Sequence, residues 1–244
     1  MLPGGFYILA ARPGCGKTAL ALQIADNVAK SGAVLFVTLE MDVSQLQARR
    51  LSRRTGISST RLLLDENLST EEWRQVQAAN VELSHLPLYA NGKAGCTVPD
   101  MRSMARKVKG LSLIVVDYLG LLQPERSRSS RYEEITAISN SLKTLARSLK
   151  VPVLCLAQLN RASEQRADKK PGLADLRDSG AIEQDADAVM LMHRPDMYDE
   201  SEHGELVFVS TQVAKNRHAG TASFQLGFNL QTGRFIPVKG GVQS

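Results

Sequence analysis

A short glycine-rich segment near the amino terminus combines the residue types that bind phosphate. It spans residues 11–18 (A-R-P-G-C-G-K-T), follows an apolar β-type run and precedes a helical pattern. Glycines let the backbone turn its N–H groups toward a phosphate, and the start of a helix adds favourable partial charge. A lysine can neutralise the β- and γ-phosphates, and a threonine hydroxyl can hold Mg²⁺. The segment predicts a nucleotide-binding P-loop formed by Arg12, Pro13, Gly14, Cys15, Gly16, Lys17, Thr18 and Ala19.

Two positions of this segment are unusual. Ala11 stands where the P-loop pattern normally begins with glycine, whereas Gly16, Lys17 and Thr18 follow that pattern. Cys15 lies inside the loop, and the start of a helix can lower the pKa of a thiol. We therefore expect thiol reagents to modify Cys15 and block nucleotide binding, unless the residue is only a small spacer. The alternative to a nucleotide site is a chance glycine-lysine-threonine helix start.

Three polar residues each follow an apolar β-type run, and all three suit nucleotide chemistry. Asp117 can hold Mg²⁺, Glu40 can accept a proton from an attacking water, and Gln158 can sense a γ-phosphate. The carboxyl ends of parallel strands meet at one edge of a sheet, where ligands collect. We therefore expect the three side chains to lie near the P-loop. The alternatives are a turn-capping acid, a solvated acid and a turn-forming amide.

The elements that must position these residues alternate between strand and helix. Apolar β-type runs at 6–11, 34–38, 113–117, 151–157 and 188–192 are separated by helical patterns, and 206–214, 221–228 and 234–238 indicate antiparallel strands. Thr97 is a candidate helix cap. This order predicts an α/β fold, a mostly parallel twisted sheet flanked by helices with antiparallel strands at its C-terminal end. We expect one domain over residues 1–238 and a flexible tail over 239–244.

Composition excludes several classes of protein. The 244 residues include three cysteines, too few for a disulfide framework, and no apolar run approaches the roughly 20 residues of a membrane span. The amino terminus lacks the pattern of a secretory signal, so we expect a cytoplasmic protein without a membrane partner. A net charge of +5 suits a polyanionic partner, although an ordinary basic surface fits it as well. Aromatic residues are only 5% of the chain, which argues against bases stacked along aromatic side chains.

Two further segments carry charges that suit phosphate binding. Lys215 and Arg217 stand between two predicted C-terminal strands, where they either form a solvated turn or reach the phosphates of a neighbouring chain. Arg177 and the backbone near Gly180 follow a polar loop and can hold a nucleic-acid phosphate. On spacing alone, a loop with a helix cap at Ser179 explains this second segment better. The four histidines are scattered without metal-ligand spacing.

Taken in order, these segments resemble the C-terminal motor domain of DnaB-type replicative helicases, a branch of the RecA-like P-loop ATPases. The family often has alanine at the position of Ala11, and segments 38–41, 116–119 and 157–161 are similar to those carrying its catalytic glutamate, its magnesium-holding strand end and its sensor. Segment 175–187 (D-L-R-D-S-G-A-I-E-Q-D-A-D) is the most distinctive match. Segment 214–217 resembles the family's segment that acts across the subunit interface, with Asn216 where glutamine is common.

The resemblance implies a RecA-like fold, ATP and Mg²⁺ as cofactors, and a hexameric ring with its sites between subunits. Such a ring moves 5′ to 3′ on single-stranded DNA and works with a primase and a helicase loader, in a bacterium or from a phage. The implied site residues are catalytic Glu40, Asp117 and Gln158, magnesium-holding Thr18 and Asp117, nucleotide-contacting Arg49, interface-crossing Lys215 and Arg217, and DNA-binding Arg177, Asp178 and Gly180.

The sequence departs from the family in one respect. Family members carry an N-terminal helical domain and a linker helix, and we expect both to be absent here, since the first predicted strand begins five residues after Met1. We expect such a chain to form rings poorly and to hydrolyse ATP weakly, an expectation that a stable hexamer would contradict. Two other functions stay open: a RecA-like recombinase that forms filaments on DNA, and a nucleotide-binding module with little activity.

Overall fold

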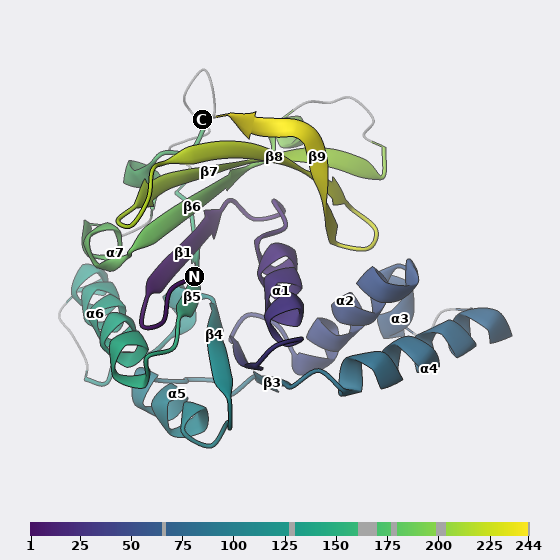
Figure 1. Cartoon of the computed structure of the whole chain (residues 1–244), viewed down its shortest axis with the longest axis horizontal. Coiled ribbons are helices and arrows are strands. Elements are labelled where there is room, and N and C mark those ends of the chain that lie inside the picture. The colour runs from purple at the N-terminus through teal and green to yellow at the C-terminus, as the bar shows by residue number, and fades with distance from the viewer. Residues whose placement is uncertain (65–66, 127–129, 161–169, 177–179, 199–203, 244) are drawn as a thin grey trace.

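One nine-stranded sheet runs through the molecule in the order β3-β2-β4-β5-β1-β6-β7-β8-β9 (Figure 1). The computed structural model describes residues 1–64, 67–126, 130–160, 170–176, 180–198 and 204–243. The six strands β1 to β6 pair in parallel. β7, β8 and β9 continue the sheet in antiparallel pairs, as predicted. The strands are β1 (Phe6–Ala11), β2 (Ala33–Thr38), β3 (Leu88–Asn91), β4 (Leu111–Asp117), β5 (Val153–Gln158), β6 (Ala188–His193), β7 (Leu206–Asn216), β8 (Ala222–Asn229) and β9 (Arg234–Gln243).

Helices cover both faces of the sheet and enclose two apolar cores. α1 and Leu46 of α2 pack with one face, while α5, α6 and α7 pack with the other. The segment of α2, α3 and α4 projects from the β3 side (Figure 1). The helices are α1 (Lys17–Val28), α2 (Val43–Thr55), α3 (Ser59–Leu64), α4 (Thr70–Ser84), α5 (Val98–Ala105), α6 (Arg131–Leu149) and α7 (Gly180–Asp185). Within the described ranges, none of them is long and apolar enough to span a bilayer.

The central strands are apolar over most of their length because most of their residues are buried on both faces of the sheet. Every residue of β2 is buried, and so are the apolar residues of β4 that lead to Asp117. Parallel strands between two helical layers require this continuous pattern rather than alternation. Local signals then set the helix starts: the Thr97 side chain accepts a hydrogen bond from the backbone N–H of Asp100 and caps α5, as predicted.

The C-terminal strands extend beyond their predicted ends. β7 continues through Asn216, so Lys215 lies within a strand and only the residues after Asn216 form the turn. β9 continues to Gln243 and pairs there with Ser223 of β8, so the strand enters the range 239–244 for which the sequence predicts a flexible tail. The register shifts between Phe224 and Leu226, so β9 bulges before it pairs again. This bulge and the Gly-Gly pair at 240–241 hide the strand in the sequence.

A buried ion pair ties the start of β1 to α6 and β6. The Asp187 carboxylate accepts hydrogen bonds from the Lys143 ammonium and, at 2.8 Å, from the backbone N–H of Phe6. Both charged side chains are largely buried. Burial alone would raise the pKa of Asp187, but these two donors outweigh it and hold the pKa below its ordinary value. The pair therefore links three elements at the amino edge of the sheet.

Replacing Asp187 with asparagine leaves the Lys143 ammonium buried without a negative partner. Breaking a buried pair in this way costs about 3–5 kcal/mol. We expect Asp187→Asn to lower the free energy of unfolding by about 3 kcal/mol in urea titrations at pH 7. The exposed pair of Glu71 and Arg74 offers a control, since Glu71→Gln should change it by less than about 0.5 kcal/mol.

The stabilisation by Asp187 should depend on pH. The folded pKa of Asp187 lies below 3.8, so its stabilisation is present above that pH and is lost as the pH falls below it. The stability gap between the natural chain and Asp187→Asn should therefore narrow below about pH 4. A gap under about 1 kcal/mol at pH 7 would contradict a stabilising pair.

Candidate functional site

A cavity of about 540 Å³ opens where the parallel strands end, and it gathers residues from distant parts of the chain. Its walls come from the loop after β1, the end of β2, the start of α2, the end of β5 and the turn between β8 and β9. The predicted residues that line it are Arg12, Pro13, Gly14, Gly16, Lys17, Thr18, Ala19, Glu40, Arg49 and Gln158. The structure thus brings together the candidates that the sequence places at the strand ends.

The loop that cradles the phosphate site depends on two glycines with left-handed backbone angles. Gly14 has a φ of 81° and Gly16 a φ of 84°, values that favour glycine. A Cβ at Gly16 would also lie 2.9 Å from the rings of Phe228 and Phe235. These two rings stack with centroids 4.4 Å apart, on strands β8 and β9. The C-terminal hairpin therefore braces the loop from outside, a contact that nothing in the sequence pattern indicated.

Cys15 does not line the cavity, and its burial argues against the reactive thiol that the sequence predicts. Its side chain is 2% exposed, and its Sγ atom lies 3.5 Å from the Sδ atom of Met197. Burial raises the pKa of the thiol above its ordinary value, although Arg194 and Arg12 partly oppose the shift. Desolvation outweighs the helix start here, which leaves little thiolate to react.

Asp117 and Thr18 form the buried floor of the site. The Thr18 hydroxyl donates a 2.6 Å hydrogen bond to Oδ2 of Asp117, which is fully buried. Burial raises the pKa of Asp117, while Thr18 and the Lys17 ammonium oppose the shift. Within the described residues, Oδ1 of Asp117 has no hydrogen-bond partner. A buried carboxylate oxygen without a partner, next to a hydroxyl, fits Mg²⁺. This ion prefers oxygen ligands and takes few of them from the protein, since it keeps several bound waters.

Lys17 lies within reach of both carboxylates at the site. Its ammonium stands 4.9 Å from the centre of the Tyr118 ring, on the face of that ring. Burial lowers the pKa of Lys17, and the negative charges of Asp117 and Glu40 act in the opposite direction. The negative charge of a bound phosphate would likewise favour the charged ammonium form of Lys17.

The turn after β2 presents Glu40 to the cavity. The hydroxyl of the buried Thr38 donates a 2.7 Å hydrogen bond to the carbonyl of Met41, which closes the turn around Glu40. The backbone N–H of Leu39 donates to the carbonyl of Asp117 at 2.6 Å, which joins the ends of β2 and β4. Sequence reasoning missed Thr38, although a hydroxyl residue at the end of an apolar strand was the available signal.

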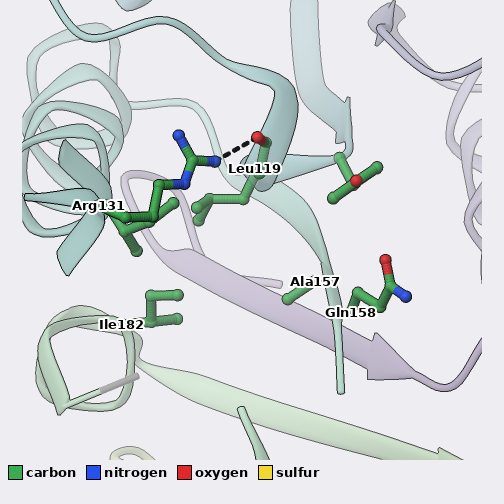
Figure 2. A pocket seen from close by; sticks show the side chains of 8 residues that line it. Leu119, Arg131, Ala157, Gln158 and Ile182 are labelled. Carbon is green, nitrogen blue, oxygen red and sulfur yellow. Dashed lines mark hydrogen bonds between the residues drawn. The ribbon is translucent and has the colours of Figure 1, made fainter. Parts of the chain in front are cut away.

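Gln158 separates the nucleotide cavity from a second, smaller one of about 150 Å³. Figure 2 shows this second cavity, with Arg131, Leu119 and Ile182 toward one side and Ala157 and Gln158 toward the other. The Arg131 guanidinium donates a hydrogen bond to the carbonyl of Gly120. Gln158 lines both cavities, and Ile182 of α7 lines the second one. Gln158 therefore connects the nucleotide cavity with a cavity that reaches α7, the helix after the predicted DNA-binding segment.

Lys215 and Arg217 lie outside the nucleotide cavity of their own chain. The Lys215 ammonium donates to the carbonyls of Glu183 and Gln184, and the Arg217 guanidinium donates to that of Gln184. These carbonyls end α7, where the helix carries partial negative charge. Gly180 begins the same helix, and a Cβ there would lie 3.4 Å from the Tyr132 hydroxyl. The predicted DNA contacts at 177 and 178 lie outside the described residues.

Several residues of the cavity were not predicted. The turn between β8 and β9 closes one side of it, and Gln45 and Ser59 add polar groups from the α2–α3 segment. Thr232 and Gly233 have residue types that suit a turn, but only the folded C-terminal strands bring that turn to the cavity. The residues missed on that side are Phe228, Leu230, Gln231, Thr232 and Gly233.

Comparison with known proteins adds a consistent result. A family model described as the DnaB-like helicase C terminal domain matches residues 1–237. The chain is 40% identical over 235 residues to the replicative DNA helicase DnaB of Geobacillus stearothermophilus, covering 94% of the chain and 51% of that relative. It is also 40% identical over 236 residues to the replicative DNA helicase DnaC of Bacillus subtilis, with the same two coverages. The chain thus spans about half the length of the curated relatives it matches.

Solved structures agree with these relatives. One of them, described as an ATPase domain, has a TM-score of 0.90 at 35% identity, covering 98% of this chain and 86% of that one. A DnaB-like replicative helicase, solved in a study of its interactions with primase, also has a TM-score of 0.90 at 35% identity, covering 98% of this chain and 58% of that one. The predicted RecA-like fold class is confirmed.

The buried position of Cys15 leads to a test. All three cysteines are buried, so an aromatic disulfide reagent should label the native chain at least about 100-fold more slowly than the urea-unfolded chain. Cys15→Ala should leave the native rate unchanged and remove one reactive thiol from the unfolded chain. Rapid native labelling of one thiol, absent in Cys15→Ala and slowed by ATP, would contradict the buried position.

Proposed function

Because the chain belongs to the family of DnaB-like helicase C-terminal domains, we propose that it works as the ATP-hydrolysing motor domain of a replicative DNA helicase. The observation that carries this proposal is the cavity in which Lys17, Glu40 and Gln158 meet above the buried pair of Thr18 and Asp117. Phosphoryl transfer requires positioned charge more than covalent chemistry, and this set provides it.

The P-loop binds the phosphates of ATP. Backbone N–H groups around Gly14 and Gly16 turn toward them, and Lys17 neutralises the β- and γ-phosphates. Arg12 and Arg49 line the same cavity and add positive charge at its walls. The Thr18 hydroxyl and Oδ1 of Asp117 would hold Mg²⁺, which supplies charge that offsets that of the phosphates.

Glu40 and Gln158 act on the reaction itself. Glu40 is exposed at the cavity wall, where its carboxylate accepts a proton from the attacking water. Gln158 hydrogen-bonds the γ-phosphate. Because Gln158 and α7 both line the second cavity, a change in the position of Gln158 would change the surroundings of α7. The turn held by Thr38 keeps Glu40 at the strand edge, so Thr38 acts as a positioning residue.

Lys215 and Arg217 complete the site of a neighbouring subunit. They do not line the cavity of their own chain, which supports action across an interface. A cation delivered from a neighbour stabilises the charge that develops during phosphoryl transfer. We place these sites between the subunits of a hexameric ring, in which Arg177, Asp178 and Gly180 hold the backbone of single-stranded DNA. The ring moves 5′ to 3′ and unwinds the duplex ahead of it.

The relatives support a proposal for the partners and the setting. The matched relatives named above are bacterial replicative helicases, and one similar helicase was solved in a study of its interactions with primase. We propose that a primase and a helicase loader are partners of this protein too, in the cytoplasm of a bacterium or of a phage-infected cell. A recombinase filament is the less favoured function, because the relatives matched here carry helicase names.

Removing Arg217 tests whether sites are completed between chains. We expect the ATPase rate per chain to rise with protein concentration and with single-stranded DNA, and to fall on the order of 10³-fold in Arg217→Ala. Arg147→Ala is the matched control, because Arg147 is exposed on α6 and should leave the rate unchanged. A low rate that ignores concentration and Arg217 would favour a nucleotide-binding module instead.

Removing the proposed base separates binding from chemistry. Glu40→Gln keeps the size and polarity of the side chain but cannot accept a proton, so hydrolysis should slow about 10²–10⁴-fold. The Kd for a non-hydrolysable ATP analogue should stay within about twofold, because the proposed role of Glu40 is to accept a proton from water and not to bind phosphate. Single-turnover hydrolysis measured beside equilibrium binding separates the two quantities. Unchanged hydrolysis in this variant would exclude Glu40 as the base.

A further inference from the structure

Another polar cavity, of about 270 Å³, lies beside α1 and shares no lining residue with the nucleotide cavity. Four cations from three elements line it: Lys30 just after α1, Arg53 and Arg54 in the last turn of α2, and Arg234 at the start of β9. Their charge converges on one hollow of the surface. Among the described residues that line this hollow, Asp26 is the one acid.

The charge of Asp26 is already committed. Its Oδ1 accepts a 2.8 Å hydrogen bond from Arg50, and its Oδ2 accepts one from Arg53. Both arginines and Asp26 are less than one-tenth exposed, so the group is fixed in place. Asp26 is therefore paired with Arg50 and Arg53, and within the described residues it pairs with none of the other cations of the cavity.

The remaining cations lack acidic partners inside the cavity. Arg54 pairs with Glu82 at 2.9 Å, but Glu82 is more than half exposed and lies outside the cavity lining. The side chains of Lys30 and Arg234 make no hydrogen bond or ion pair with the part of the chain that the structure describes. Converging like charges repel one another, which destabilises the folded chain unless an anion lies between them.

The walls of this cavity are held by specific contacts. The Gln23 side chain donates to the carbonyl of Phe235 and accepts from its N–H, both at 2.9 Å. This two-point contact anchors the start of β9 on α1, so Arg234 is attached to a fixed backbone. Asn27 is exposed, lines the cavity and is one helical turn from Lys30, which adds an amide donor.

We propose that this cavity binds a phosphate group. A phosphate carries up to two negative charges and several acceptor oxygens, which matches a site built from cations and one amide donor. Two sources share that chemistry: free inorganic phosphate or pyrophosphate, and a phosphate of a nucleic-acid backbone. The site borders the nucleotide cavity, since Thr232 and Gly233 line one and Arg234 lines the other.

The test uses the whole chain with its P-loop filled by ADP and Mg²⁺. Inorganic pyrophosphate is titrated by calorimetry into the natural chain and into the Lys30→Gln/Arg234→Gln double variant. We expect Kd to rise at least about tenfold in that variant. The double variant Arg106→Gln/Lys109→Gln removes the same charge from exposed positions elsewhere and should leave Kd unchanged.

The source of the phosphate is then decided with a single-stranded oligonucleotide. Removing two phosphate contacts should decrease the steepness of the plot of log K against log salt by about 1.4 in the Lys30→Gln/Arg234→Gln variant. That decrease assigns the site to a nucleic-acid backbone, whereas an unchanged slope with lost pyrophosphate binding assigns it to free phosphate. Equal pyrophosphate affinity in both double variants would overturn the proposal. None of these readouts depends on ATP hydrolysis, so they stand apart from the motor function.

Discussion

A single buried hydrogen bond, from the Thr18 hydroxyl to the Asp117 carboxylate, joins the two elements on which the nucleotide site depends. Thr18 belongs to the first turn of α1, and Asp117 ends β4. The carbonyl of Asp117 also accepts from the N–H of Leu39, so the same residue fixes the turn that carries Glu40. Asp117 therefore holds the phosphate loop through its carboxylate and the turn of the proposed base through its main-chain carbonyl. Its full burial explains why an apolar strand has to lead up to it.

The antiparallel strands complete this arrangement from the opposite side. β7, β8 and β9 curve above the start of α1 (Figure 1), and the Phe228–Phe235 stack meets Gly16 where no side chain fits. The Gln23 side chain holds the backbone of Phe235. The loop is thus positioned by the parallel sheet below it and by an aromatic pair above it. A P-loop confined on both sides keeps its N–H groups oriented without a bound nucleotide.

Local patterns were sufficient to predict the layers and most of the cavity. The continuous apolar runs placed the parallel strands, and the polar residue after each run lies at the strand edge that ligands use. Contacts between distant segments were beyond the reach of those patterns. The sulfur contact of Met197 with Cys15 buries the thiol, and the bulge in the pairing of β8 with β9 hides the last strand. Both depend on residues far apart in sequence, whose approach only the folded sheet decides. For the same reason, the Asp26–Arg50–Arg53 network was not predicted.

The contacts of Lys215 and Arg217 with the end of α7 have a consequence for mutational studies. Both side chains are bound to backbone carbonyls, and every residue type carries the same carbonyl. The residues at 183 and 184 can therefore change freely while these two cations keep the same acceptors. An alanine scan of α7 would leave the contact in place and would report no role for it. Sequence variation in this helix therefore does not reveal the interaction, because the main chain of the helix makes it.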